Sequence, residues 1–189
     1  MRKITISQVK EALSKKELKE GLEKYLRLRD GLNKQKMKDS KFQKSYKGFF
    51  RMRRDENFCT EYFKFMEKCE NNKKVTFKKV LDHLYDKTKK VEASFASKLL
   101  SMINPDMPVL DSQVLKVLCI KLVRCSADKT KRIECSNTVY REICEWYKKH
   151  FDSGEAEKWI KLFDKHYPEA KDKITDVKKI DLILWQIRE

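Results

Sequence analysis

The chain has 189 residues, of which 39% are charged and 40% are hydrophobic. This charged share is far above the roughly 25% typical of soluble domains, and it excludes an integral membrane protein. Lysine and arginine number 45 against 29 aspartate and glutamate residues, so the formal net charge is +16. Such an excess attracts a polyanion, which makes nucleic acid the first candidate partner. The chain has only 4 glycines and 3 prolines, which favours helices joined by short connections over β-hairpin folds.

The first residues and the cysteines indicate the cellular compartment of the protein. The N-terminus has no apolar core of a secretion signal, and no stretch approaches the roughly 20 apolar residues of a membrane span. We therefore expect a cytoplasmic protein that does not enter a membrane. The cysteines include no C-x-x-C pair, and we interpret all six as reduced core thiols. No spacing of cysteines or histidines indicates a metal site, and we expect no cofactor.

The N-terminal part of the chain predicts closely spaced helices. A short helix from Ser7 is followed by one over residues 15–29, where Ser14 and Glu17 form the pattern of a capping box. Gly31 is expected to interrupt the helical pattern of residues 15–29. A basic helix should follow Gly31 and end near residues 53–55.

Residues 31–54 form the most basic part of the chain, with only Asp39 as an acidic residue. Aromatic residues interleave with the cations at spacings typical of a buried helix face. One interpretation is a solvated lysine-rich helix with an aromatic core stripe, and the other is a nucleic-acid-binding face. The two are compatible, because one face can pack while the other meets phosphate. The cations expected to contact nucleic acid here are Lys44, Lys47, Arg51, Arg53 and Arg54.

The rest of the chain also follows a helical period, and no strand-period run is longer than a few residues. Helices are predicted over residues 57–70, 91–104, 112–123, 137–150, 153–166 and 175–187. A further helix is predicted to begin at Phe77, with Thr76 as its N-cap. The fold class is therefore all-α, with about nine or ten helices. We expect one compact unit over 1–189, or two interlocked lobes, formed by 1–75 with the C-terminal helix and by 76–175.

The segment from 77 to 118 carries the most specific pattern. A helix and a short turn precede a second helix whose first turns contain small residues, which let another backbone approach closely. Pro105 stops that second helix, and Pro108 fixes an extended entry to Asp111, which is well placed to cap the next helix. This order resembles the helix-hairpin-helix DNA glycosylase superfamily. The words VEASFASKLLSMINPDMPVLDSQVL and KKIDLILWQ are similar to a bacterial glycosylase-like family with a degenerate hairpin.

The resemblance implies a glycosylase-like fold with a hairpin element near residues 77–104 that binds the DNA backbone. It implies a role in DNA repair, with Asp111 as the catalytic aspartate because it follows a Pro-Val run. Bifunctional members use a lysine of the second hairpin helix as a nucleophile, and Lys98 is the lysine on that helix. By direct alignment of the turn, however, Ser94 falls at the nucleophile position, one helical turn before Lys98. A plain N-cap remains the alternative role for Asp111.

The hairpin turn departs from the resemblance, because residues 88–92 contain no glycine. Glycines there allow backbone amides to approach phosphate closely. We expect Lys89 and Lys90 to replace these amides by charge, although Glu92 would then face the phosphate.

Three classes of function remain open. The first is a DNA-binding base-excision N-glycosylase or lyase, or a degenerate relative that has lost the activity. The second is a non-catalytic helical module that binds nucleic acid, DNA before RNA, through the basic stretch. The third is a protein-interaction module whose positive charge maintains solubility.

Overall fold

The computed structural model describes residues 4–34, 36–70, 72, 74–121 and 128–187. Within these residues the protein is entirely helical and contains no strand, which confirms the predicted fold class. The α-helices are α1 (Ile6–Ser14), α2 (Lys16–Asn33), α3 (Ser40–Phe49), α4 (Glu56–Lys68), α5 (Phe77–Thr88), α6 (Ala93–Ile103), α7 (Ser112–Leu118), α8 (Lys129–Asp152), α9 (Glu155–His166) and α10 (Asp176–Gln186). Two short 3₁₀ helices cover Lys36–Lys38 and Pro168–Ala170.

Two predictions near the N-terminus are wrong. A capping box forms, but at the start of α1, where Thr5 and Gln8 bond to each other's backbone amides. The Ser14 hydroxyl instead donates back to the Glu11 carbonyl, and α2 begins without a side-chain cap. Gly31 does not break α2 but lies buried within it. A Cβ at this position would lie 2.8 Å from the Phe42 ring, so glycine allows α2 and α3 to pack closely.

Other helices begin or end earlier than predicted, because their ends are set by local capping contacts and not by the apolar pattern. Helix α3 ends at Phe49 rather than near residue 54. Helix α7 stops at Leu118, because Cys119 adopts a left-handed conformation and the Ile120 amide bonds back to the Leu115 carbonyl. The two last predicted residues of that helix, 122 and 123, lie outside the described part of the chain. Helix α8 begins at Lys129 because the Asp128 side chain caps it there.

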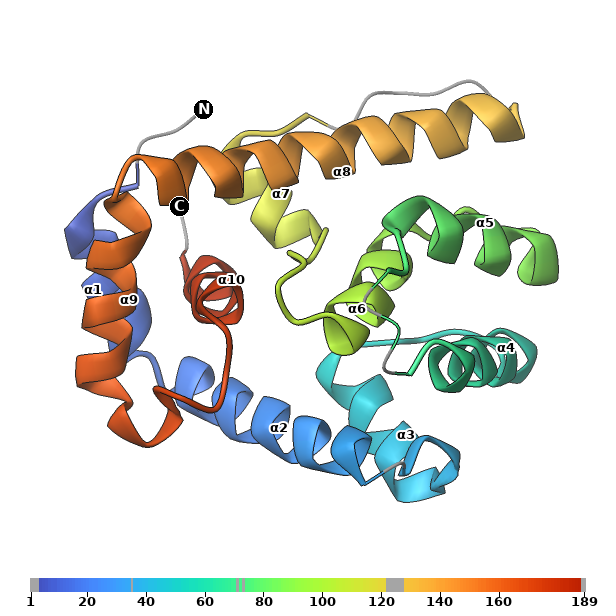
Figure 1. Cartoon of the computed structure of the whole chain (residues 1–189), viewed down its shortest axis with the longest axis horizontal. Helices are drawn as coiled ribbons and strands as arrows, with labels where there is room; N and C mark the ends of the chain where they lie inside the picture. The colour runs from blue at the N-terminus through green and yellow to red at the C-terminus, as the bar shows by residue number, and fades with distance from the viewer. Residues whose placement is uncertain (1–3, 35, 71, 73, 122–127, 188–189) are drawn as a thin grey trace.

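Helix α10 occupies the centre of the packing. It contacts α1, α2, α7 and α9, so the end of the chain joins elements from its beginning and its middle (Figure 1). The long helix α8 reaches from α9 to α5 and bridges the two sides of the molecule. Apart from Val109, the buried hydrophobic residues form one continuous cluster. The division into two lobes stays a prediction.

Helices α5 and α6 are consecutive and pack against each other, so the predicted pair of helices is present. The turn between them is closed by Lys89, which ends α5 in the left-handed region with φ of 58°. Glycine is the usual residue at such a position, because a side chain there is strained.

The cysteines do not all match the prediction of reduced core thiols. Cys59, Cys69 and Cys144 are free and at least partly buried, but Cys119 is free and exposed. Cys135 is disulfide-bonded, so the prediction is wrong for that residue, and Cys125 lies outside the described residues. Among the described helices, none is long and apolar enough to cross a membrane.

Candidate functional site

A wide groove of about 1830 Å³ lies between helices in the described part of the molecule. Helices α2 and α3 form one wall, and the segment after α3 continues it. The first turns of α6 and α7 lie on the other side, together with the end of α10. Five separate stretches of the chain therefore line one concave space, the kind of place where ligands bind.

Lys98 and Asp111 meet in this groove. The Nζ atom of Lys98 lies 3.1 Å from Oδ2 of Asp111, and the two side chains are 8% and 25% exposed. Lys98 comes from the middle of α6, and Asp111 caps α7 through a hydrogen bond from the Gln113 amide. The structure thus brings together the two residues that the sequence singled out, and it also shows the capping role of Asp111. Ser94 lines the same groove.

Aromatic rings surround the Lys98 ammonium group. Nζ lies 5.2 Å from the centre of the Phe95 ring and 6.0 Å from that of Phe50. The guanidinium of Arg54 also lies over Phe95, at 5.3 Å. Arg54 in addition pairs with Glu92, with 2.9 Å between Nη2 and the carboxylate. Rings that attract cations on their faces hold both positive groups at the edge of the groove.

The connection between α6 and α7 determines where Asp111 lies relative to Lys98. Ser97 fixes the end of this connection, since its hydroxyl accepts from the Leu110 amide and donates to the Leu110 carbonyl. The Tyr140 hydroxyl donates to the Pro108 carbonyl, and the Thr175 hydroxyl donates to the Pro105 carbonyl. Side chains from three helices or their caps therefore hold the backbone that positions Asp111.

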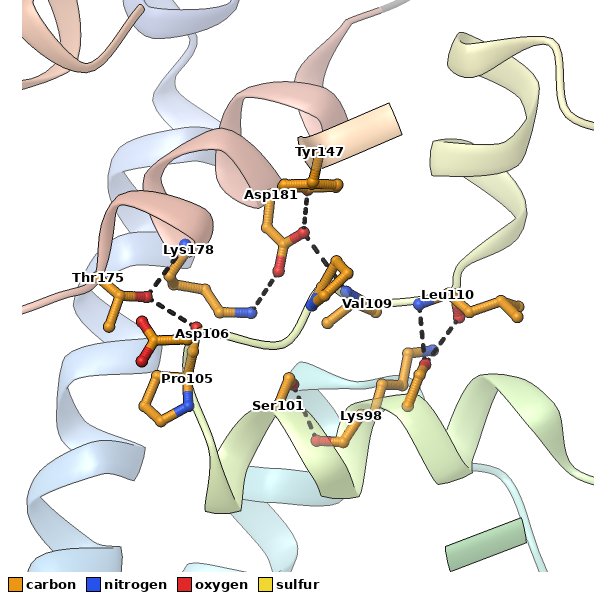
Figure 2. A network of polar contacts seen from close by, with 12 residues as sticks. Lys98, Ser101, Pro105, Asp106, Val109, Leu110, Tyr147, Thr175, Lys178 and Asp181 are labelled. Atoms are coloured by element: carbon orange, nitrogen blue, oxygen red, sulfur yellow. Dashed lines mark hydrogen bonds and ion pairs between the residues drawn. The ribbon is translucent and has the colours of Figure 1, made fainter. Parts of the chain in front are cut away.

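Figure 2 shows a second lysine–aspartate pair behind this connection. Lys178 Nζ lies 2.6 Å from Oδ2 of Asp181, and both side chains are essentially inaccessible to solvent. Oδ1 of Asp181 accepts from the Tyr147 hydroxyl at 2.5 Å and, at 3.5 Å, from the Val109 amide. Burial, together with the Asp181 charge, raises the pKa of Tyr147, so its hydroxyl stays protonated and donates. This pair braces the connection from its buried side.

The cations predicted to bind nucleic acid divide into two sets. Arg51 and Arg54 line the groove. Lys44, Lys47 and Arg53 do not line it; Lys44 and Arg53 are exposed, and Lys47 is half-buried in the last turn of α3.

Lys89 and Lys90 lie exposed at the turn between α5 and α6. The Lys89 ammonium group donates to the Asp86 carbonyl. Lys90 hydrogen-bonds Asp55 at 2.8 Å, and this bond lowers the pKa of the Asp55 carboxyl. Glu92, which we expect to face phosphate, is paired with Arg54.

Sequence reasoning missed several residues of the groove. Arg27 and Lys41 line the wall, and Trp185, at the end of α10, lines the groove with its ring against Phe49. The periodicity of α2 gives a partial signal, because its buried stripe of leucines leaves Arg27 on a neighbouring face. Which exposed face borders a groove depends on the packing of α6 and α7 and is not visible in the sequence of α2.

No family model, curated protein or solved structure matches this chain. The groove and the chemistry of its residues are therefore what indicates a function.

Proposed function

We propose that the protein binds DNA in this groove and acts on an extruded nucleotide as a base-excision N-glycosylase with lyase activity. The observation that carries the proposal is the 3.1 Å contact of Lys98 with Asp111 in an open groove. An amine beside a carboxylate can break an N-glycosidic bond by nucleophilic attack with proton transfer.

The reaction assigns one task to each side chain. Asp111 accepts a proton from the Lys98 ammonium group, and the neutral amine attacks C1′ of the sugar. The bond between C1′ and the base breaks, its electron pair leaves with the base, and the proton held by Asp111 passes to the base. The Asp111 carboxylate, restored by that transfer, stabilises the positive charge of the secondary ammonium group now bonded to C1′. Asp111 then carries one proton from this nitrogen to the ring oxygen O4′, and the C1′–O4′ bond breaks, which opens the sugar and gives a protonated Schiff base.

The surroundings of the pair suit a nucleic-acid substrate. Phe49 and Trp185 line the groove, and each is partly exposed, so both present aromatic surface to a base that enters it. Lys89 and Lys90 are exposed at the turn between α5 and α6, and their charge would make the phosphate contacts that glycine amides make in the resembling superfamily. Because Arg54 offsets the charge of Glu92, the acidic residue of the turn does not repel phosphate unopposed.

Borohydride trapping on a duplex with an abasic site tests the chemistry, because reduction of a Schiff base leaves a permanent protein–DNA adduct. The parent protein should form the adduct and Lys98→Gln should not. Lys148→Gln is the matched control, because Lys148 is an exposed lysine that pairs with Asp152 on α8, away from the groove residues. Adduct formation by Lys98→Gln equal to that of the parent contradicts the assignment of the nucleophile.

Asp111→Asn separates catalysis from folding. Asparagine caps helices about as well as aspartate, so the α7 cap and the fold should persist. Base release should fall by a factor of about 10² or more, since loss of one acid–base group typically costs that much. Unchanged base release by a folded Asp111→Asn variant excludes the catalytic role and leaves Asp111 as an N-cap.

A non-catalytic DNA-binding protein is the second candidate, favoured by one specific observation: the turn between α5 and α6 carries strained Lys89 where a glycine is usual. Fluorescence anisotropy distinguishes the two candidates when an intact duplex is compared with one carrying an abasic-site analogue, at low and physiological salt. Lesion preference that persists at physiological salt supports the enzyme. Equal binding that disappears with salt, without adduct formation, supports the second candidate.

A further inference from the structure

The wall formed by α2 and α3 has cations with no acidic partner. Arg27, Lys41 and Arg51 line the groove and form no ion pair with any described residue. Four of the six acidic residues that line the groove are paired with lysine or arginine: Asp111 with Lys98, Glu92 with Arg54, Asp30 with Lys34, and Glu20 with Lys16 and Lys24. The charge left for a ligand on this wall is therefore mainly positive.

Two glycines on the same wall have no role in packing. Gly21 and Gly48 lie within α2 and α3 and line the groove, and an added Cβ at either position would meet nothing within 4 Å. Gly31 is the contrasting case, because the Phe42 ring occupies the space of its missing side chain. Glycine inside a helix is less stable than alanine, so Gly21 and Gly48 weaken their helices without a gain in packing. They leave helix backbone open to the groove.

Arg51, three residues after Gly48, is the reverse case: a residue with a side chain stands where glycine would be more stable. It has a φ of 51°, and its amide and that of Met52 bond back to the carbonyls of Gly48 and Lys47. This is the Schellman motif, in which the left-handed residue is usually glycine. Helix α3 thus carries glycine where a helix favours a side chain and arginine where the turn favours glycine. Sequence choices that oppose local stability are expected at functional sites.

We propose that the α2–α3 wall binds the sugar–phosphate backbone of one nucleic-acid strand. This inference depends on the proposed function, since the strand is the one whose nucleotide enters the Lys98–Asp111 site. Gly21 and Gly48 let the strand approach the helices closely, and Arg27, Lys41 and Arg51 contact its phosphates. Nucleic acid fits better than an acidic protein segment, because the groove also holds partly exposed aromatic rings on which bases can stack.

Two variants of α3 separate this role from stability. Arg51→Gly should be at least as stable as the parent, because glycine relieves the left-handed strain. It should nevertheless bind a single-stranded oligonucleotide on the order of fivefold more weakly at about 0.1 M salt. The slope of log affinity against log salt concentration should also decrease by about the amount that one phosphate contact contributes. Gly48→Gln should also keep or raise the melting temperature, because glutamine favours helix, and should weaken binding by filling the open space.

Thr60→Gln is the control, because Thr60 is exposed on α4 outside the groove: glutamine should keep or raise the melting temperature there as well, but leave binding unchanged. Parent-like binding by stable Arg51→Gly and Gly48→Gln variants overturns the inference, whatever the trapping experiment gives. Weaker binding by both variants without any Schiff-base adduct supports the wall and rejects the enzyme. Competition by polyglutamate as strong as that by an oligonucleotide of equal charge, or no nucleic-acid binding by the parent, also overturns the inference.

Discussion

Two lysine–aspartate pairs lie on opposite sides of the connection between α6 and α7, and their surroundings differ. Lys178 and Asp181 are sealed in the core, and the Asp181 carboxylate also accepts hydrogen bonds from Tyr147 and Val109. Lys98 and Asp111 face the groove, and a quarter of the Asp111 side chain is exposed. The same two functional groups therefore stand in two environments, one closed to ligands and one open to them.

Burial separates the structural role of one pair from the chemical role of the other. A buried ion pair must have its remaining hydrogen-bonding capacity satisfied within the protein, and Asp181 meets this need by bonding both to a helix side chain and to the connection. One carboxylate oxygen of Asp111 caps α7 and the other contacts Lys98, and the side chain remains partly exposed to solvent. The sealed pair therefore holds the backbone in place, and the open pair is available for reaction.

Asp181→Ala should have the largest effect on stability. It leaves the Lys178 ammonium group charged and without its partner in the core, and it removes the acceptor of Tyr147 and Val109. Loss of one partner of a buried pair typically costs about 3–5 kcal/mol. Urea denaturation followed by circular dichroism should show a loss in this range or no folded protein at all.

The double variant Asp181→Leu with Lys178→Met tests whether the unpaired charge causes that loss. Replacement of both charges by apolar groups is often tolerated, so the double variant should be more stable than Asp181→Ala. A double variant as unstable as Asp181→Ala would assign the effect to the hydrogen bonds of Tyr147 and Val109 instead.

Lys98→Met should have a smaller effect on stability. Methionine retains the length of the apolar stem beside Phe50 and Phe95, and the partly exposed Asp111 carboxylate can be hydrated after it loses its partner. The expected loss, between the values for exposed and buried pairs, is about 1–2 kcal/mol in the same urea titration. A loss equal to that of Asp181→Ala would remove the distinction between the two pairs and make Lys98 a structural residue.

The sequence predicted the helical fold and most of the helices, because apolar periodicity and caps such as Thr76, Asp111 and Thr175 are local signals. It failed at Gly31, where a tertiary contact with Phe42 lets a helix continue through a residue that usually weakens it. It placed Lys98 and Asp111 together only through a family resemblance. The bonds of Asp181 to Val109 and Tyr147 span 72 and 34 residues, and no local pattern specifies such contacts.

His150 provides the smallest expected effect and a test of which region responds to acid. It lies one turn after Tyr147 on α8, stacked on Trp146, and its buried Nε2 atom has no partner. Burial lowers the pKa of His150 to about 4, below its ordinary value near 6.5. Between these pH values the folded protein therefore binds fewer protons than the unfolded chain. The free energy of unfolding should be unaffected by His150 above pH 6.5 and should decrease as the pH falls toward 4.

Because His150 is partly exposed, the decline that it causes by pH 5 should stay below about 1 kcal/mol. His150→Phe should make the free energy of unfolding less dependent on pH between 7.5 and 5.0, as measured by urea titrations at both values. Lys98→Met should keep the parent's dependence, since the open pair lies in a different region. If Lys98→Met removes the acid sensitivity and His150→Phe does not, proton binding acts at the groove, and the core around α8 is not the region that acid weakens.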